Sequence, residues 1–251
     1  MTLDRYTRWQ VAPVHFGISA VLAALVVGAM LLLWYPRPFF NAAGGQTLLL
    51  LLIGVDVVLG PLLTLIVFDP RKKSLKPDLA VIVLLQVAAL AYGAWIMFEA
   101  RPAYVAFAGD RFELVEANAI DAADQAKAKA GFRTLPLTGP EIVGTRRPLD
   151  PEERERMRQA ALLGGGIGLF PQHYIPYATV ARDAVARGAP LAQLRARRPE
   201  RAADVAAWVA ASGQPEAMFR YLPLRARHGD MTVILDAASG DVRGVLPIDP
   251  W

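Results

Sequence analysis

The sequence predicts a membrane protein with three transmembrane α-helices, followed by an extracytoplasmic α+β domain with a small antiparallel sheet. Two observations lead to this fold class. The composition is 54% hydrophobic and 20% charged, with a mean hydropathy of +0.31, which is more apolar than an ordinary soluble domain. The longest apolar runs also lie in the first hundred positions, so we expect an anchor at residues 1–100 and a domain at residues 101–251.

Three segments of the anchor are long enough to cross a bilayer. Each contains about 20 nearly uninterrupted apolar residues, the length that a helix needs to cross a hydrocarbon core of roughly 30 Å. We expect spans at about residues 14–35, 46–68 and 79–98. Buried helices of a soluble core would have amphipathic faces, which these segments lack. The first span is also longer than the apolar run of about 7–15 residues in a signal peptide, so we expect an uncleaved anchor.

The basic residues of the short connections predict the orientation. Arg5 and Arg8 precede the first span, and the second loop contains four cations in FDPRKKSLKPD. The first loop, YPRPFFNAAGGQ, contains only Arg37. Because Lys and Arg accumulate on the cytoplasmic side of membrane helices, we expect the N-terminus and the second loop in the cytoplasm. Residues 101–251 then lie on the opposite side.

The external domain is expected to be a small antiparallel sheet covered by helices. Alternating apolar residues surround a turn at Gly109–Asp110, and a second hairpin pairs residues 232–235 with residues 242–246. RYLPLR is expected to be an edge strand, where Pro223 would cost least. Helices are expected at residues 122–130, 151–163 and 202–211. Since the chain has no cysteine, this domain must be stable without disulfides.

The sequence contains no recognisable catalytic or metal-binding pattern. GGGIG, at residues 164–168, is not followed by Gly-Lys-Ser or Gly-Lys-Thr, and we expect a loop that ends a helix. His15, His173 and His228 are not at metal-ligand spacing from one another, and no cysteine could complete a zinc site. A Gly-x-Ser-x-Gly elbow is also absent. We therefore predict a protein that is not an enzyme and has no cofactor.

One dense basic cluster, RARRPER at residues 195–201, could suggest nucleic acid. It lacks the interleaved aromatic residues on which bases stack. We expect a solvated helix end and no nucleic-acid partner.

The second span contains polar residues in an apolar setting, GVDVVLGPLLTL. Asp56 lies about ten residues into this span, near the middle of a bilayer at 1.5 Å per residue. Insertion of Asp at that depth costs about 2.5–3.5 kcal/mol, so the carboxyl should be protonated, paired or turned into the helix bundle. Gln86, on the third span, lies within about one helical turn of the same depth.

Several parts of the chain resemble the TfpX/TfpZ family of type IV pilin accessory proteins. They are WYPRPFFNAAGGQTLLLLLIGVDVVLGPLLTLIVFDPRKK, the third span, and the closing run of YLPLR, VILDAASGDVRGVL and PW. The resemblance implies a bacterial inner-membrane accessory protein or chaperone with a periplasmic domain, which supports the stability or assembly of the type IV major pilin. It implies no cofactor and no catalytic residue. The oligomeric state stays open.

Two hypotheses for the polar residues remain. In the first, Asp56 and Gln86 form an interhelical hydrogen bond worth about 0.6–2 kcal/mol that fastens the three helices. In the second, Asp56, Gly60, Pro61 and Thr64 form a docking groove for the pilin's transmembrane helix. A spacing of four places three of them on one face, and the proline frees the carbonyl of Val57.

A function of another class is also open. An anchored external domain could belong to a sensor. Because the expected cytoplasmic segments are too short for an output domain, such a sensor would act through a membrane partner.

Overall fold

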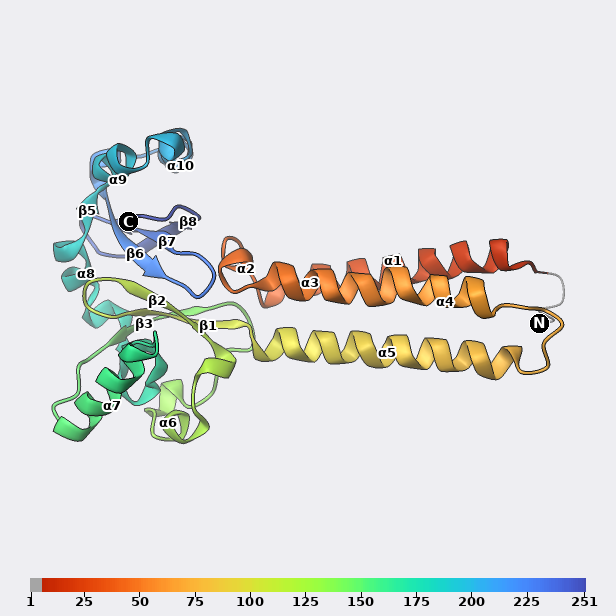
Figure 1. The fold of residues 1–251 in the computed structure, drawn as a ribbon. Coiled ribbons are helices and arrows are strands. Elements are labelled where there is room, and N and C mark those ends of the chain that lie inside the picture. The colour runs from red at the N-terminus through yellow and green to blue at the C-terminus, as the bar shows by residue number, and fades with distance from the viewer. Residues whose placement is uncertain (1–5) are drawn as a thin grey trace. The chain divides into compact units, whose positions relative to one another are not determined.

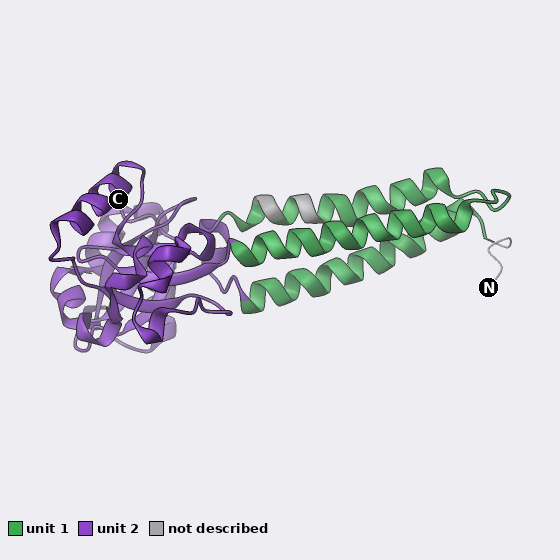
Figure 2. Ribbon diagram, turned by 90° about the horizontal axis from the view of Figure 1, so that it is seen from below, with its two compact units in different colours: residues 1–33, 44–99 green, residues 34–43, 100–251 purple. Residues whose placement is uncertain are grey.

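The computed structural model describes residues 6–251, without the side chains of residues 47, 48, 51 and 52. The chain divides into two compact units, which Figure 2 shows in different colours. Unit 1 comprises residues 1–33 and 44–99, and unit 2 comprises residues 34–43 and 100–251.

Unit 1 is a bundle of apolar helices (Figure 1). Its elements are α1 (Arg8–Leu33), α3 (Gly45–Ile53), the π-helical turn η2 (Gly54–Leu59), α4 (Gly60–Val67) and α5 (Leu75–Glu99). Among the described residues, α1 and α5 are long and apolar enough to cross a membrane, with mean hydropathies of 2.6 and 2.2. The expected span at residues 46–68 is helical from 45 to 67, but η2 divides it into shorter elements.

Few residues of α1 and α5 are buried. Only 17% of the most apolar window of α1 and 6% of that of α5 are buried. The core helix of a soluble protein would be mostly buried. The two long helices of unit 1 therefore present apolar surfaces to their surroundings.

Unit 2 is built on one mixed sheet of eight strands. The spatial order is β4-β3-β1-β2-β6-β7-β8, with β5 paired to β6. The strands are β1 (Pro102–Phe107), β2 (Phe112–Glu116), β3 (Glu141–Thr145), β4 (Tyr174–Pro176), β5 (Ala189–Pro190), β6 (Phe219–Arg225), β7 (Met231–Asp236) and β8 (Val242–Leu246).

The prediction of a small antiparallel sheet is wrong in size and in strand direction. β1 pairs with β3 and β2 pairs with β6 in parallel, and the other pairs are antiparallel. Parallel neighbours need long connections, and the chain supplies them between β2 and β3 and between β2 and β6. The strands that the sequence did not predict, β3, β4 and β5, have two to five residues and lack a clear apolar alternation.

Both predicted hairpins are confirmed. β1 and β2 pair around a turn in which Gly109 has a φ of +100° and Ala108 N–H donates to the carbonyl of Arg111 at 2.8 Å. β7 and β8 pair around a turn in which Gly240 has a φ of +82°. Both glycines have a backbone conformation that residues with a side chain rarely adopt.

The prediction that RYLPLR is an edge strand is wrong, because β6 lies inside the sheet. On one side residues 219–224 pair with β7. On the other side β5 pairs with residues 220 and 221, and β2 pairs with residues 224 and 225. Pro223 lies between these two short ladders and has no paired partner on that side, which is why a residue without an N–H is tolerated there.

Helices cover the sheet of unit 2. They are α6 (Ala122–Ala126), α7 (Pro151–Leu162), α8 (Ala181–Arg187), α9 (Leu191–Arg197) and α10 (Ala202–Ser212). The three predicted helical windows correspond to α6, which is shorter than expected, and to α7 and α10. Asp121 and Asp150 cap α6 and α7 by accepting backbone N–H bonds, and α10 ends at Gly213 with a φ of +65°.

Residues 34–43 belong to unit 2, although the sequence placed them in the anchor of residues 1–100. This segment contains the short helix α2 (Phe39–Ala42). Phe39 and Ala42 are part of a core cluster with Val105, Leu224 and Val233, and the Ala42 carbonyl accepts the N–H of His228 at 3.1 Å. Burial of this apolar loop explains why it joins the sheet domain.

Candidate functional site

The polar side chains of unit 1 gather around η2. In this turn Gly60 N–H donates to the carbonyl of Val55, five residues earlier, which is the π-helical register. The same register would pair the carbonyl of Asp56 with the nitrogen of Pro61, which carries no hydrogen. Gln86 of α5 supplies the missing donor, since its Nε2 lies 2.9 Å from the Asp56 backbone oxygen.

This geometry corrects two sequence-based expectations. The freed carbonyl that receives a donor is that of Asp56, one residue before the expected Val57, because the helix is π-helical at this point. The expected hydrogen bond between Asp56 and Gln86 is present, but it is made by the backbone carbonyl of Asp56. The carboxyl group of Asp56 does not take part in it.

Gly60 is in direct contact with the amide of Gln86. A Cβ atom built on Gly60 would lie 1.8 Å from Gln86 Nε2, far inside van der Waals contact. The absence of a side chain at this position therefore allows α5 to place Gln86 against η2. Gly60 and Pro61 are both buried.

Two polar side chains of α1 complete the cluster. His15 Nδ1 lies 2.6 Å from Thr64 Oγ1, and Gln86 Nε2 lies 3.5 Å from Ser19 Oγ. Sequence reasoning considered His15 only as a metal ligand and missed Ser19. Their spacing of four along an apolar helix is the signal that could have found them, since it places both on one face.

The Asp56 carboxyl group has no hydrogen-bond partner among the described residues. Its side chain is buried, with 5% of its surface exposed, and neither Oδ atom is bonded. Gln86 Oε1 is unbonded as well. The acidic group lines a pocket of about 310 Å³ among the helices of unit 1, together with Val11, Val14, His15, Ile18, Ser19, Leu22, Thr64, Leu79, Val83, Gln86, Val87 and Leu90.

Of the five residues that the sequence singled out, Asp56, Thr64 and Gln86 line this pocket. Gly60 contacts the Gln86 amide, and Pro61 is the next residue of α4. A buried acceptor without a donor costs free energy, of the order of 1–3 kcal/mol. This pocket, which we call the Asp56 pocket, is therefore suited to a ligand or helix that brings a hydrogen-bond donor into an apolar setting.

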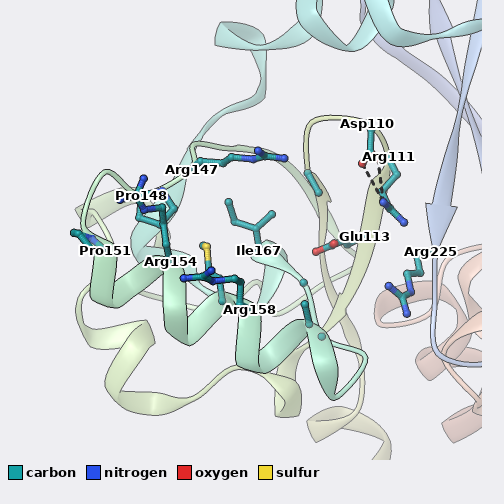
Figure 3. Close-up of a pocket in the computed structure, with 15 residues that line it drawn as sticks. Asp110, Arg111, Glu113, Arg147, Pro148, Pro151, Arg154, Arg158, Ile167 and Arg225 are labelled. Carbon is teal, nitrogen blue, oxygen red and sulfur yellow. Dashed lines mark hydrogen bonds and ion pairs between the residues drawn. The ribbon is translucent and has the colours of Figure 1, made fainter.

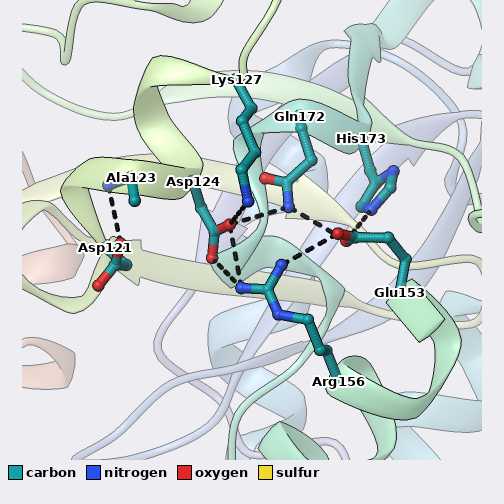
Figure 4. A network of polar contacts seen from close by, with 8 residues as sticks. All are labelled: Asp121, Ala123, Asp124, Lys127, Glu153, Arg156, Gln172 and His173. Carbon is teal, nitrogen blue, oxygen red and sulfur yellow. Dashed lines mark hydrogen bonds and ion pairs between the residues drawn. The ribbon is translucent and has the colours of Figure 1, made fainter.

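Unit 2 contains a second polar cluster, which Figure 4 shows between α6, α7 and the segment after it. Asp124 pairs with Arg156 at 2.8 Å and with Lys127 at 3.2 Å, and Glu153 pairs with Arg156 at 3.0 Å and with His173 at 3.2 Å. Burial disfavours the charge on Asp124, but the bonds from Arg156 and Lys127 outweigh it and hold the pKa of this carboxyl below its usual value. The cluster fastens α7, which has no buried residue of its own.

The arginines of residues 195–201 have partners within unit 2. Arg195 pairs with Glu216, Arg201 pairs with Asp204, and Arg198 pairs with Asp249 and donates to the carbonyl of Trp251. These bonds attach the C-terminal residues to α9.

The fold and the site define a class of protein. It has an apolar helical unit, with a largely apolar pocket that contains a buried carboxyl group, and a separate α+β domain. No group of three His, Cys, Asp or Glu residues in the described part of the chain could hold a metal ion.

Comparison with known proteins gives the family. The model of the family described as fimbrial assembly protein FimB matches residues 4–44. The chain is 31% identical to the fimbrial assembly protein of serogroup I from Dichelobacter nodosus over 186 residues, which are 73% of this chain and 72% of that protein. It is 35% identical to the protein of serogroups C1 and C2 over 108 residues, 42% of this chain and 82% of that protein. The chain belongs to the FimB family of fimbrial assembly proteins. No solved structure matches it significantly.

Proposed function

We propose that this chain is a non-enzymatic inner-membrane accessory protein, or chaperone, of type IV pilus biogenesis, and that its partner is the major pilin. The relatives that it matches are named fimbrial assembly proteins, which supports a role in building pili. The resemblance of its second span and C-terminal run to the TfpX/TfpZ family favours the more specific role in pilin stability or assembly.

In this proposal unit 1 crosses the membrane three times, through α1, through the helical run at residues 45–67, and through α5. Large apolar side chains on all three are exposed: Leu32 at 81%, Leu50 at 71% and Leu84 at 67%. Such exposure is costly in water and favourable in lipid. The basic residues at 71–76 then lie in the cytoplasm, and unit 2 lies in the periplasm.

The Asp56 pocket is the proposed contact for the pilin's transmembrane helix. The observation that carries this assignment is the buried Asp56 carboxyl, which has no donor while Gln86 is bonded to the backbone beside it. In the alternative role, Asp56 links the helices within this protein. The backbone carbonyl of Asp56 makes that link by accepting a hydrogen bond from Gln86, so the carboxyl group is available to a partner. A donor from a second helix would satisfy it within the apolar bilayer, where unmade hydrogen bonds are costly.

Site-specific photo-crosslinking in membranes tests this function. A photoreactive amino acid at Val83, which lines the Asp56 pocket and is 50% exposed, should crosslink to pilin. The same amino acid at Leu84 is the matched control, because this neighbour is also exposed and does not line the pocket. Equal pilin capture from both positions, or none from Val83, would contradict the assignment.

A further inference from the structure

Unit 2 has a cleft between α7 and the β1–β2 hairpin in which arginines gather. Its volume is about 620 Å³, and its charged lining residues are Asp110, Arg111, Glu113, Arg147, Arg154, Arg158 and Arg225. Figure 3 shows Arg154 and Arg158 on α7 on one side, Arg111 and Arg225 on the other, and Glu113 and Ile167 between them. Five cations and two carboxylates give the lining an excess of positive charge.

Three of these arginines have no ion pair among the described residues. Arg111 is held by Asp110 in two bonds of 3.0 Å, and Arg158 pairs with Glu155 at 2.6 Å. No such bond is made by Arg147, Arg154 and Arg225, and all three are exposed. Like charges gathered around one concave surface raise the local concentration of anions.

The carboxyl of Glu113 lines the cleft and accepts a hydrogen bond from the glycine loop. Gly168 N–H donates to Glu113 Oε2 at 2.8 Å, and a Cβ atom on Gly166 would lie 2.0 Å from Oε1. Burial raises the pKa of Glu113, although the Gly168 bond and the nearby Arg111 and Arg225 oppose the rise. The GGGIG motif therefore forms a wall of this cleft.

Exposed leucines flank both ends of α7. Leu149, before the helix, is 93% exposed, and Leu162 and Leu163 at its end are 86% and 91% exposed. A second cavity of about 480 Å³ shares Glu113 and Arg225 with the cleft and is also lined by Leu163. Since α7 has 12 residues, it is about 18 Å long, the length of about six residues of extended peptide.

We propose that this cleft binds an acidic, extended segment of a protein partner. Carboxylates of the segment would pair with Arg147, Arg154 and Arg225, and its apolar side chains would contact the leucines that flank α7. A single phosphate would fill only a small part of the volume. None of the described residues that line the cleft is aromatic, which disfavours the bases of a nucleic acid.

Peptide binding to the purified full-length chain in detergent tests this proposal. The probe is a fluorescein-labelled Glu-Leu-Glu-Glu-Leu-Glu peptide, and its control has Gln in place of each Glu. Anisotropy should show binding of the acidic peptide that weakens as salt is raised, since exposed charges are screened. Arg147→Gln with Arg154→Gln should weaken it about tenfold, a loss of about 1.4 kcal/mol.

A matched variant separates a local effect from net charge. Lys129→Gln with Arg182→Gln removes two exposed cations outside the cleft and should change the affinity less than about twofold. Equal loss in both double variants, equal binding of the Gln peptide, or no binding of the acidic peptide at low salt would overturn the proposal. Binding of inorganic phosphate or phosphatidylglycerol vesicles through these arginines, without peptide binding, would assign the cleft to a phosphate or lipid ligand and would overturn it as well.

Discussion

Gln86 Nε2 donates a hydrogen bond of 2.9 Å to the backbone carbonyl of Asp56, and not to its carboxylate. The bond occupies the position that a backbone N–H would hold if residue 61 were not proline. It joins α5 to the π-helical turn. The backbone of Asp56 therefore has the structural role, and the carboxyl group is not needed for it.

The contact between Gly60 and Gln86 predicts a steric effect of adding one methyl group. Gly60→Ala should destabilise unit 1 by about 0.6–1.7 kcal/mol, because the new Cβ would displace the Gln86 amide and break its hydrogen bond to the Asp56 carbonyl. Gly17→Ala, on α1, is the control, since no atom lies within 4 Å of its added Cβ. Thermal unfolding in detergent and abundance in membranes measure the effect. If the two variants have the same stability, Gly60 does not serve this packing.

The role of Pro61 predicts that substitutions at residues 61 and 86 have non-additive effects on the free energy of unfolding. Gln86→Leu should cost about 0.6–1.7 kcal/mol in the natural sequence, the range of hydrogen bonds between membrane helices. In a Pro61→Ala background it should cost less, because residue 61 would supply a backbone N–H to the same region. A double-mutant cycle on unfolding in detergent measures the difference. An equal cost in both backgrounds would show that Gln86 does not replace the donor missing at Pro61.

The turn between β7 and β8 predicts a pH dependence of unit 2. Asp236 accepts bonds from Arg243 and from the N–H groups of Ser239 and Ala238, which lower its pKa from 3.8 to about 2. Since the folded pKa lies below the unfolded one, this stability is complete above about pH 4 and is lost as the pH falls through about 2.

Asp236→Asn should therefore lower the melting temperature at pH 7 by up to about 4 °C and have little effect near pH 2. Asp183→Asn, at an exposed carboxylate of α8 that has no ion pair among the described residues, should lower the melting temperature at pH 7 less than Asp236→Asn does. Near-ultraviolet circular dichroism of the full chain measures both. A difference that stays constant from pH 7 to pH 2 would contradict the charge-based account.

The proposed topology predicts the activity of reporter fusions. Alkaline phosphatase fused after residue 251 should be active, and a fusion after Lys73 should be inactive, because the enzyme needs the periplasm to fold. A fluorescent reporter that functions only in the cytoplasm should give the opposite pattern at the same positions. An active phosphatase at residue 73 with an inactive one at 251 would reverse the orientation.

The sequence predicted the elements that long apolar runs or turn glycines specify. The apolar runs gave α1 and α5, and the turn glycines Gly109 and Gly240 gave the two hairpins. The short strands β3, β4 and β5 could not be predicted, because they exist through pairing with residues distant in the sequence. Pro223 suggested an edge strand. It is tolerated inside the sheet because it lies between the residues of β6 that pair with β5 and those that pair with β2.

The candidate site shows the same division. The polar residues of the second span, together with Gln86, identified its location. The π register could not be read from the sequence, because it depends on how α5 packs against η2. The contacts of His15 with Thr64 and of Ser19 with Gln86 depend on how α1 packs against α4 and α5, which neither span specifies alone.

The most direct test of the account compares Asp56→Leu with Asp56→Asn, with this protein and the pilin quantified in the same membranes. Because Gln86 bonds the backbone of residue 56, Asp56→Leu should leave the abundance of this protein unchanged. It should lower pilin level or surface piliation by about tenfold, corresponding to about 1.4 kcal/mol of lost binding, whereas Asp56→Asn keeps a polar acceptor and should preserve most of the function. Normal pilin and piliation in the leucine variant, or a loss of this protein that equals the loss of pilin, would contradict the claim that the carboxyl group meets the pilin helix.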